Sequence, residues 1–507
     1  MKRIADFVEV ASAVVALCAA VTIPLPAQTF STLYSFCLPG YPCTGGDQPS
    51  AGLVQGIDGN LYGTTTWGGA NNTCCEGAGT VFKITTNGAL TTLYSFCAET
   101  GCADGANPYG TLLQAGNGAL YGTTASGGAY GGGTVFKVTP SGTLTTLYGF
   151  CAQSYCTDGQ SPRGALIQAS NGDLYGTTYY GGVNSVAHNG NGGTIFKITP
   201  SGTLTTVYSF CAQSECADGL GPYAGLVQAS NGDFYGTTQA GGAKGCEYGC
   251  GTVFKMTPGA TLHKLYDFCA QSGCTDGYLP TAALVQAANG NLYGTTQADG
   301  PSGGGTLFQV TLDGKLTTLY GFCSQAGCAD GYGPTAALVQ GTDGNLYGTA
   351  PGGGGSNWEG TVFEITTNGT LTALYAFCEQ SGDSTGNCPD GAVPSGVFQA
   401  TDGSFYGTTQ YGGAALAYGA VFGLSVDLGP FVQILPASGK VGAVVKILGT
   451  DLTGTTAVTF KGAAAAFKVV SSTEITATVP TGATTGTVQV TTPGGPLNSN
   501  VAFRVTP

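Results

Sequence analysis

Cysteine pairs are the most regular feature of this sequence that could do chemistry. The chain has 19 cysteines but only 2 histidines, and pairs of cysteines recur along it at short spacing. A structural zinc site needs four ligands and shorter Cys-x2-Cys spacing, so the pairs predict local disulfides, and no metal or other cofactor is expected. The adjacent Cys74 and Cys75 could pair only through a strained bond, so their state stays open. The expected pairs are Cys37 with Cys43, Cys97 with Cys102, Cys151 with Cys156, Cys211 with Cys216, Cys246 with Cys250, Cys269 with Cys274, Cys323 with Cys328, and Cys378 with Cys388.

An aspartate followed by glycine comes after the second cysteine of most of these pairs. One interpretation is a ring of carboxylates that binds calcium, but a calcium ion takes about six to eight oxygen ligands and each repeat offers a single carboxylate. The other is a turn that starts the next strand, in which the carboxylate accepts backbone N–H groups and the glycine supplies conformational freedom. The sequence favours the turn. The candidates are Asp104, Asp158, Asp218, Asp276, Asp330 and Asp390.

Aromatic side chains in the longer loops are the candidate binding residues. A ring on a surface rich in Asn, Thr and Gly suits stacking on sugars, because it offers an apolar face beside hydrogen-bonding groups. The alternative is that these rings pack down over neighbouring glycines. The candidates are Trp67, Tyr130, Tyr179, Tyr180, Tyr248, Trp358 and Tyr411.

Residues for catalysis are sparse. His188 and His263 stand alone in different parts of the chain, and a lone histidine is a weak candidate for a general base. Arg163 is the single arginine between Arg3 and Arg504, so an arginine cluster of the sialidase kind cannot form. Loop glutamates could supply the acid pair of a glycosidase, but their spacing does not indicate one. We therefore expect a protein that is not an enzyme. The glutamates are Glu76, Glu99, Glu215, Glu247, Glu359 and Glu379.

The first residues and the charge indicate a compartment. Lys2 and Arg3 precede an apolar run over residues 10–23, which is typical of a secretory signal cleaved after Ala27. Cleavage would remove Cys18 and leave 18 of the 19 cysteines in an oxidising space. The formal net charge of −13 argues against nucleic acid as a partner. No later apolar run is long enough to cross a bilayer, so no transmembrane anchor is expected in the mature chain.

A long repeat must position all of these residues. The motif Leu/Phe-Tyr-Gly-Thr occurs seven times at intervals of 54 to 60 residues, and each copy holds four short strand-like runs separated by turn signals such as Asn117-Gly118. Four antiparallel strands repeated seven times predict an all-β fold, a seven-bladed β-propeller over residues 28–428. The seventh copy lacks its fourth run, while a run of this type over residues 30–37 precedes the first copy. We expect this N-terminal strand to complete the last blade and close the ring.

The repeat also resembles a known family. LYGTTxxGG followed by GTVFKxTxxGxLTTLYxFC is similar to the GloVer tandem repeat of secreted bacterial proteins, over about residues 30–425. This resemblance implies a propeller-like protein that is secreted or held at the cell surface, and it implies no particular activity. Residues 429–507 form a second expected domain, and PFVQILPASGKVGAVVKILGTDL within it resembles an IPT/TIG immunoglobulin-like domain. Its short alternating runs suit a small β-sandwich.

Up-and-down connectivity assigns the loops to two faces of the ring. The turns after the first and third strands of each blade are short, whereas the loops after the second and fourth strands carry the disulfides and vary in length. Because binding residues concentrate on variable loops, the disulfide-bearing face is the expected binding face. The sequence predicts a bacterial, secreted or surface protein that serves adhesion or binds a polysaccharide or a surface protein without catalysis. A secreted carbohydrate-active enzyme (a glycosidase or lyase) and a purely structural envelope or matrix protein remain the alternatives.

Overall fold

The computed structural model describes residues 28–37, 43–71, 77–185, 192–242, 246, 249–379, 388–414 and 418–506. The proposed signal segment, Cys74, Cys75, Tyr248 and His188 lie outside the described residues. The regular elements in this part are strands and single 3-10 turns, which confirms the all-β prediction. No helix among them is long and apolar enough to cross a bilayer.

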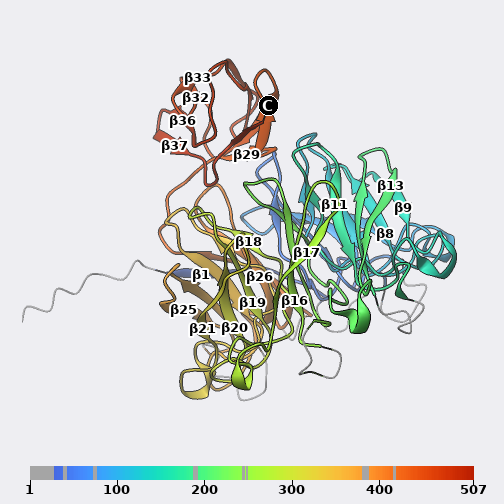
Figure 1. Cartoon of the computed structure of the whole chain (residues 1–507). Coiled ribbons are helices and arrows are strands. Elements are labelled where there is room, and N and C mark those ends of the chain that lie inside the picture. The colour runs from blue at the N-terminus through green and yellow to red at the C-terminus, as the bar shows by residue number, and fades with distance from the viewer. Residues whose placement is uncertain are drawn as a thin grey trace, which may run out of the picture.

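Seven four-stranded antiparallel sheets form the blades of the propeller, with the first strand of each blade next to the axis (Figure 1). The first strands are β2 (Val54–Gln55), β6 (Leu113–Gln114), β10 (Ile167–Gln168), β14 (Val227–Gln228), β18 (Val285–Gln286), β22 (Val339–Gln340) and β26 (Ala392–Gln399). The second strands are β3 (Leu61–Thr65), β7 (Leu120–Thr124), β11 (Leu174–Thr178), β15 (Phe234–Thr238), β19 (Leu292–Thr296), β23 (Leu346–Ala350) and β27 (Phe405–Tyr411). The third strands are β4 (Thr80–Ile84), β8 (Thr134–Val138), β12 (Thr194–Ile198), β16 (Thr252–Met256), β20 (Thr306–Val310), β24 (Thr361–Ile365) and β28 (Ala420–Ser425). The fourth strands are β5 (Leu90–Ser95), β9 (Leu144–Gly149), β13 (Leu204–Ser209), β17 (Leu262–Asp267), β21 (Leu316–Gly321), β25 (Leu371–Ala376) and, for blade 7, β1 (Thr29–Ser35).

The N-terminal strand closes the ring, as the sequence predicts. β1 pairs antiparallel with β28, from Thr29 opposite Ser425 to Ser35 opposite Ala420. The pairing continues beyond the strand, because the Phe36 amide donates to the Gly419 carbonyl at 2.8 Å. The seventh blade therefore takes strands from both ends of the propeller sequence, and β28 is not left as an open edge.

One aromatic contact joins every blade to the next. The phenylalanine that follows each fourth strand packs against a phenylalanine in the third strand of the following blade, with ring centroids 5.1 to 5.3 Å apart and ring planes at 60 to 67° to each other. At the closure point this pair is Phe36 of blade 7 and Phe82 of blade 1. The other pairs are Phe96 with Phe136, Phe150 with Phe196, Phe210 with Phe254, Phe268 with Phe308, Phe322 with Phe363, and Phe377 with Phe422.

The Leu-Tyr-Gly-Thr motif serves this packing. In blade 2, a Cβ on Gly122 would lie 2.5 Å from the Phe136 ring, so only glycine lets the ring cross the strand. Tyr121 is fully buried, and its hydroxyl accepts a hydrogen bond from the Asn117 amide at 2.9 Å, which fixes the hairpin turn. Thr124 bonds the Thr134 hydroxyl across the strands at 2.8 Å.

A second set of contacts links the inner ends of the blades. The glutamine of most first strands accepts the backbone N–H of the preceding blade's first turn, at 2.8 to 3.0 Å. The link from Thr401 to Gln55 again joins blade 7 to blade 1. The exception is Gln114 of blade 2, whose amide oxygen and nitrogen are buried and have no hydrogen-bond partner among the described residues.

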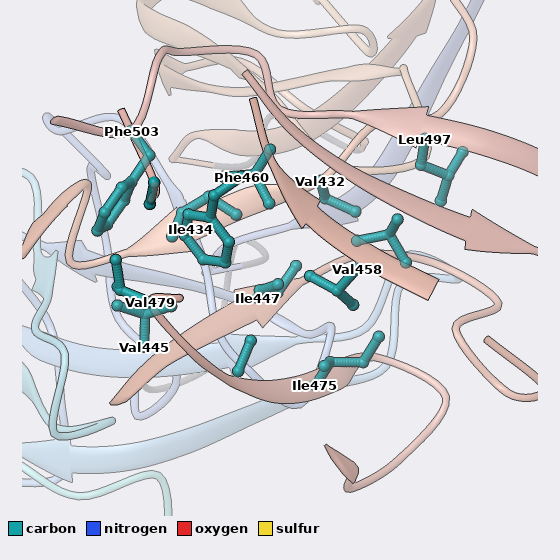
Figure 2. Close-up of a cluster of buried hydrophobic side chains, with 14 of the residues drawn as sticks. Val432, Ile434, Val445, Ile447, Val458, Phe460, Ile475, Val479, Leu497 and Phe503 are labelled. Atoms are coloured by element: carbon teal, nitrogen blue, oxygen red, sulfur yellow. The ribbon is translucent and has the colours of Figure 1, made fainter. Parts of the chain in front are cut away.

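Residues after the propeller form a β-sandwich. One sheet has the order β29-β31-β35-β34, and the other has the order β33-β32-β36-β37. Their inner faces meet in one apolar core that includes Ile434, Ile447, Val458, Phe460 and Phe503 (Figure 2). The strands are β29 (Gln433–Leu435), β30 (Ser438–Lys440), β31 (Val444–Leu448), β32 (Ala457–Phe460), β33 (Ala463–Ala464), β34 (Phe467–Val469), β35 (Glu474–Thr478), β36 (Val488–Thr492), β37 (Gly495–Asn498) and β38 (Arg504–Thr506), the last pairing in parallel with β30.

This C-terminal domain sits on the face of the short turns, at one end of the propeller (Figure 1). The Thr473 hydroxyl donates to the Ile57 carbonyl in the first turn of blade 1. Arg504 donates to the Ala229 carbonyl in blade 4 and to the Ser170 hydroxyl in blade 3. Because blades 1 and 4 lie on different sides of the axis, the domain extends across the axis on this face.

Ring closure can be tested with a matched pair of substitutions. We expect Phe36→Ala and Phe96→Ala to lower the free energy of unfolding by similar amounts, about 3–5 kcal/mol, because each removes the same buried ring from an interface between blades. Chemical denaturation of both variants measures this. A Phe36→Ala variant as stable as the wild type would contradict closure by the N-terminal strand.

Candidate functional site

The disulfides stabilise the loops on the face opposite the C-terminal domain. All eight pairs named from the sequence form disulfides. In five of the loops the second cysteine ends a single 3-10 turn. These turns are η1 (Thr100–Cys102), η2 (Ser154–Cys156), η4 (Ser214–Cys216), η5 (Ser272–Cys274) and η6 (Ala326–Cys328). Two groups of metal-ligand types, Cys246 with Cys250 and Cys269, and Cys37 with Cys43 and Asp47, contain these same bonded sulfurs rather than free thiolates.

The aspartates of these loops accept hydrogen bonds from the loop backbone and from the preceding strand. Asp218 is fully buried and accepts the Tyr208 hydroxyl at 2.8 Å and the backbone N–H groups of Ala212 and Gln213 at 3.0 and 3.1 Å. Asp104, Asp158, Asp276 and Asp330 repeat this pattern, and Asp390 accepts Tyr375 and one backbone N–H. A calcium ion at any of them would have to displace these donors. The bonds reach back to the preceding fourth strand, whereas the sequence indicated a turn that starts the next one.

A central cavity of about 380 Å³ lies on the propeller axis and takes its lining from all seven blades. Each blade enters it immediately after a proline, where the chain passes from the disulfide loop into the first strand. The residues directly after the prolines are Ser50, Tyr109, Arg163, Tyr223, Thr281, Thr335 and Ser395. Within the described residues, the lining holds one cation, Arg163, and no carboxylate.

Arg163 lies among three tyrosines. Its guanidinium carbon is 4.9 Å from the ring centroid of Tyr179, 5.4 Å from that of Tyr223 and 5.6 Å from that of Tyr109. These are cation–π distances. Burial raises the pKa values of Tyr109 and Tyr179, and the neighbouring Arg163 charge partly offsets the rise, so both phenols are neutral at physiological pH.

A larger cleft of about 720 Å³ lies beside the cavity, over blades 3 to 5. Tyr179, Tyr180 and Tyr278 supply its aromatic walls, and Gln239 and Asp299 supply polar groups. Gln239 lines both the cleft and the cavity, and its amide oxygen accepts a hydrogen bond from the Tyr179 hydroxyl at 2.7 Å. Tyr179, which contacts Arg163 on one side and lines the cleft, therefore separates two adjoining hollows.

The predicted aromatic residues do not all meet. Tyr179 and Tyr180 line the cleft with their rings 4.5 Å apart. Trp358 is 48% exposed and packs on Tyr332 elsewhere, Tyr130 is 61% exposed, and neither lines the cleft or the cavity. Trp67 is half-buried, and Tyr411 is exposed but close enough to raise the pKa of Tyr109 slightly. Of the loop glutamates in the described part, Glu99, Glu215, Glu359 and Glu379 line neither hollow.

Sequence reasoning did not identify Tyr109, Tyr223 or Tyr278, and it treated Arg163 only as evidence against a sialidase. The repeat itself holds a signal for Tyr109, Arg163 and Tyr223. When the seven repeats are aligned at their prolines, the following residue is Ser or Thr in four blades and Tyr, Arg and Tyr in the consecutive blades 2, 3 and 4. Because these three exceptions to Ser or Thr lie in neighbouring blades, their side chains are expected on the same side of the axis.

Family comparisons agree with the geometry. The model of the Gloeobacter/Verrucomicrobia repeat matches residues 18–217 and 212–422, and that of the IPT/TIG domain matches residues 431–505. The chain belongs to the Gloeobacter/Verrucomicrobia repeat family. Together with the disulfides, the repeat and the TIG domain fit a propeller-like extracellular protein. No curated protein matches the chain.

Solved structures resemble this repeat protein at low identity. A fungal alcohol oxidase of the AA5 family, in complex with copper, is 13% identical with a TM-score of 0.50 over 95% of this chain and 100% of its own. A putative 6-phosphogluconolactonase from Bacteroides uniformis is 18% identical with a TM-score of 0.41 over 65% of this chain and 84% of its own. Likeness at this level concerns the fold, and no activity is transferred from it.

The Asp–Tyr pairs of the disulfide loops make an alkaline titration informative. Burial, followed by the hydrogen bond to the neighbouring aspartate, raises the pKa values of Tyr94, Tyr148, Tyr208, Tyr266 and Tyr375 well above the ordinary value of about 10. Because the folded pKa exceeds the unfolded one, this stabilisation is complete below about pH 10 and is lost as the pH rises further. We expect these phenols to ionise only as the protein unfolds, which phenolate absorbance and circular dichroism measure together. The denatured chain, in which all 26 tyrosines should ionise near pH 10, is the control. Complete ionisation of the folded protein near pH 10 would contradict the pairs.

Proposed function

We propose that this protein is an extracellular carbohydrate-binding protein that receives a glycan chain in the cleft over blades 3 to 5. The observation that carries the proposal is the joining of three tyrosines with polar groups in one hollow of about 720 Å³. Tyrosine rings offer apolar faces for stacking on sugars, and their hydroxyls and the Gln239 amide offer hydrogen bonds to sugar hydroxyls. A volume of this size suits several sugar units rather than a large protein surface.

The position of the cleft also supports an external ligand. It lies among the disulfide loops, whereas the TIG domain contacts the short turns on the opposite face. A ligand could therefore reach the cleft while the TIG domain stays docked. The disulfides keep the loops in place without a bound ligand, which lowers the entropy lost on binding.

We propose binding rather than hydrolysis. Glycosidases of the common type place two carboxyl groups about 5 to 10 Å apart across the scissile bond. Among the described residues, the cleft lining offers Asp299 alone and the central cavity offers no carboxylate. One carboxylate can accept hydrogen bonds from sugar hydroxyls, but it cannot act as both acid and base on the two faces of a sugar.

A glycan array followed by calorimetry tests the proposal. We expect the wild type to bind at least one oligosaccharide and Tyr180→Ala to weaken this binding about tenfold or more, the loss of about 1.4 kcal/mol that one stacked ring can account for. Tyr180 is chosen because its ring lines the cleft without contacting Arg163.

Tyr155→Ala is the matched control. Tyr155 lies in a disulfide loop and is 80% exposed, outside the cleft, so its removal should leave affinity unchanged. Equal losses in both variants, or no binding by the wild type to any sugar on the array, would overturn the proposal.

A further inference from the structure

We infer that Arg163 forms a carboxylate subsite at the end of this cleft, so that the bound glycan carries an acidic sugar such as a uronate. The inference rests on the proposed function and narrows its ligand to one chemical class. It depends on the environment of the guanidinium group and on its position beside the cleft.

The guanidinium group has no hydrogen-bond acceptor within the described part of the chain. Its Nε atom is buried and has no hydrogen-bond partner, and no carboxylate lies within ion-pairing distance. Three tyrosine rings lie within 6 Å of it, and they stabilise the charge without using its N–H groups. An arginine has five N–H donors in a fixed plane. The four on the two Nη atoms make no hydrogen bond within the described residues and stay available to a ligand, whereas the Nε–H is buried.

The other arginine of the described chain shows what a structural role looks like. Arg504 donates hydrogen bonds to the Ala229 carbonyl and the Ser170 hydroxyl, and so attaches the TIG domain to two blades. Arg163 makes no such bond. Placing a cation in a partly buried hollow without a counter-ion costs free energy, so a residue that merely fills this position would be Ser or Thr, as in four other blades.

The surroundings select an anion with a single charge. The rest of the cavity lining offers hydroxyl and amide groups, from residues such as Thr281, Thr335, Gln239 and Gln297, and no second cation. A planar carboxylate matches the two parallel N–H groups of guanidinium, and one negative charge balances one positive charge. Neutral hydroxyls and amides around it suit the hydroxyls of the same sugar ring.

Tyr179 connects this subsite to the cleft. Its ring lies 4.9 Å from the guanidinium carbon, it lines the cleft, and its hydroxyl is held by Gln239, which lines both hollows. A glycan lying along Tyr180 and Tyr278 would pass this ring and bring an acidic unit to Arg163. One ligand can therefore occupy both hollows.

A panel of uronate oligosaccharides, each paired with its carboxyl-reduced form, tests the inference. Reduction replaces the carboxylate by a neutral CH₂OH group and leaves the rest of the sugar unchanged. We expect the wild type to bind at least one acidic oligosaccharide more than about tenfold more tightly than its reduced partner. Arg163→Gln should abolish this preference and leave affinity for the reduced form unchanged, and Arg163→Lys should retain part of it, because lysine keeps the charge but loses the planar pair of donors.

Arg504→Gln is the matched control, since it removes the same charge from the opposite face of the propeller. It should leave the preference for the acidic sugar intact. Melting temperatures of all three variants exclude loss of fold, and sulfated oligosaccharides form a further arm that distinguishes a sulfate ester from a carboxylate.

The failures of the two proposals are distinguishable. Equal binding of acidic and reduced sugars, lost in Tyr180→Ala but unchanged in Arg163→Gln, would overturn the carboxylate subsite and leave the proposed function standing. Preference for sulfated over uronate sugars would overturn the carboxylate assignment. Loss of the acidic preference in Arg504→Gln would show that overall charge, not Arg163, causes it, and would also overturn the inference.

Discussion

The contact between two inclined phenylalanine rings of neighbouring blades is the interaction on which the whole structure depends. It occurs at all seven interfaces with nearly the same distance, including the one between the first and last blades of the sequence. Such uniform contacts fix the angle between blades, and seven equal angles must add up to a closed ring. The glycine of each Leu-Tyr-Gly-Thr motif is required by this contact, because a side chain there would meet the phenylalanine ring. The residues that recur in every repeat thus make the contacts that close the ring. Positions that differ between repeats do not take part in these contacts.

The loops on the disulfide-bearing face have restraints of their own. Each fourth strand leads into a disulfide loop. In six of the seven loops an aspartate, fully buried in five of them, accepts hydrogen bonds from the strand's tyrosine and from the loop's own N–H groups, whereas the loop after β1 has Gly45 at this place. These six loops therefore have a covalent and a hydrogen-bonded restraint, and the loop delivers the proline and the following residue to the axis in every blade. The six aspartates and the disulfide cysteines of these loops therefore need no ligand to explain them. They hold the backbone, while the side chains after the prolines are free to differ.

Strands, blade number and closure could be predicted from the sequence because they follow from local signals: turn residues, alternating runs and a displaced fourth strand. The first strands are only two residues long in six blades, shorter than their apolar runs suggest, because the chain before them belongs to the cavity lining. The residues of the candidate site were harder to predict. Tyr130 and Trp358 are exposed aromatic residues in loops, but they line neither hollow. Tyr109 and Tyr223 come from separate blades and contact Arg163 only in the closed ring. Contacts of this kind depend on the curvature of the ring, which no single repeat encodes.

The two faces of the propeller differ in what their side chains contact. The chain of glutamine bonds around the short-turn face is broken at Gln114, between blades 1 and 2, and the TIG domain bonds the blade 1 turn at Ile57. This face is thus occupied by the protein's own second domain, and its arginine is committed to that contact. The opposite face has Arg163, which has no hydrogen-bond partner in the part of the chain that the structure describes, with three tyrosines around it and a cleft at its side. In a chain with so few charged residues, a cation surrounded by aromatic rings fits the acidic ligand that we infer, and the blades place this cation at the axis, next to the cleft.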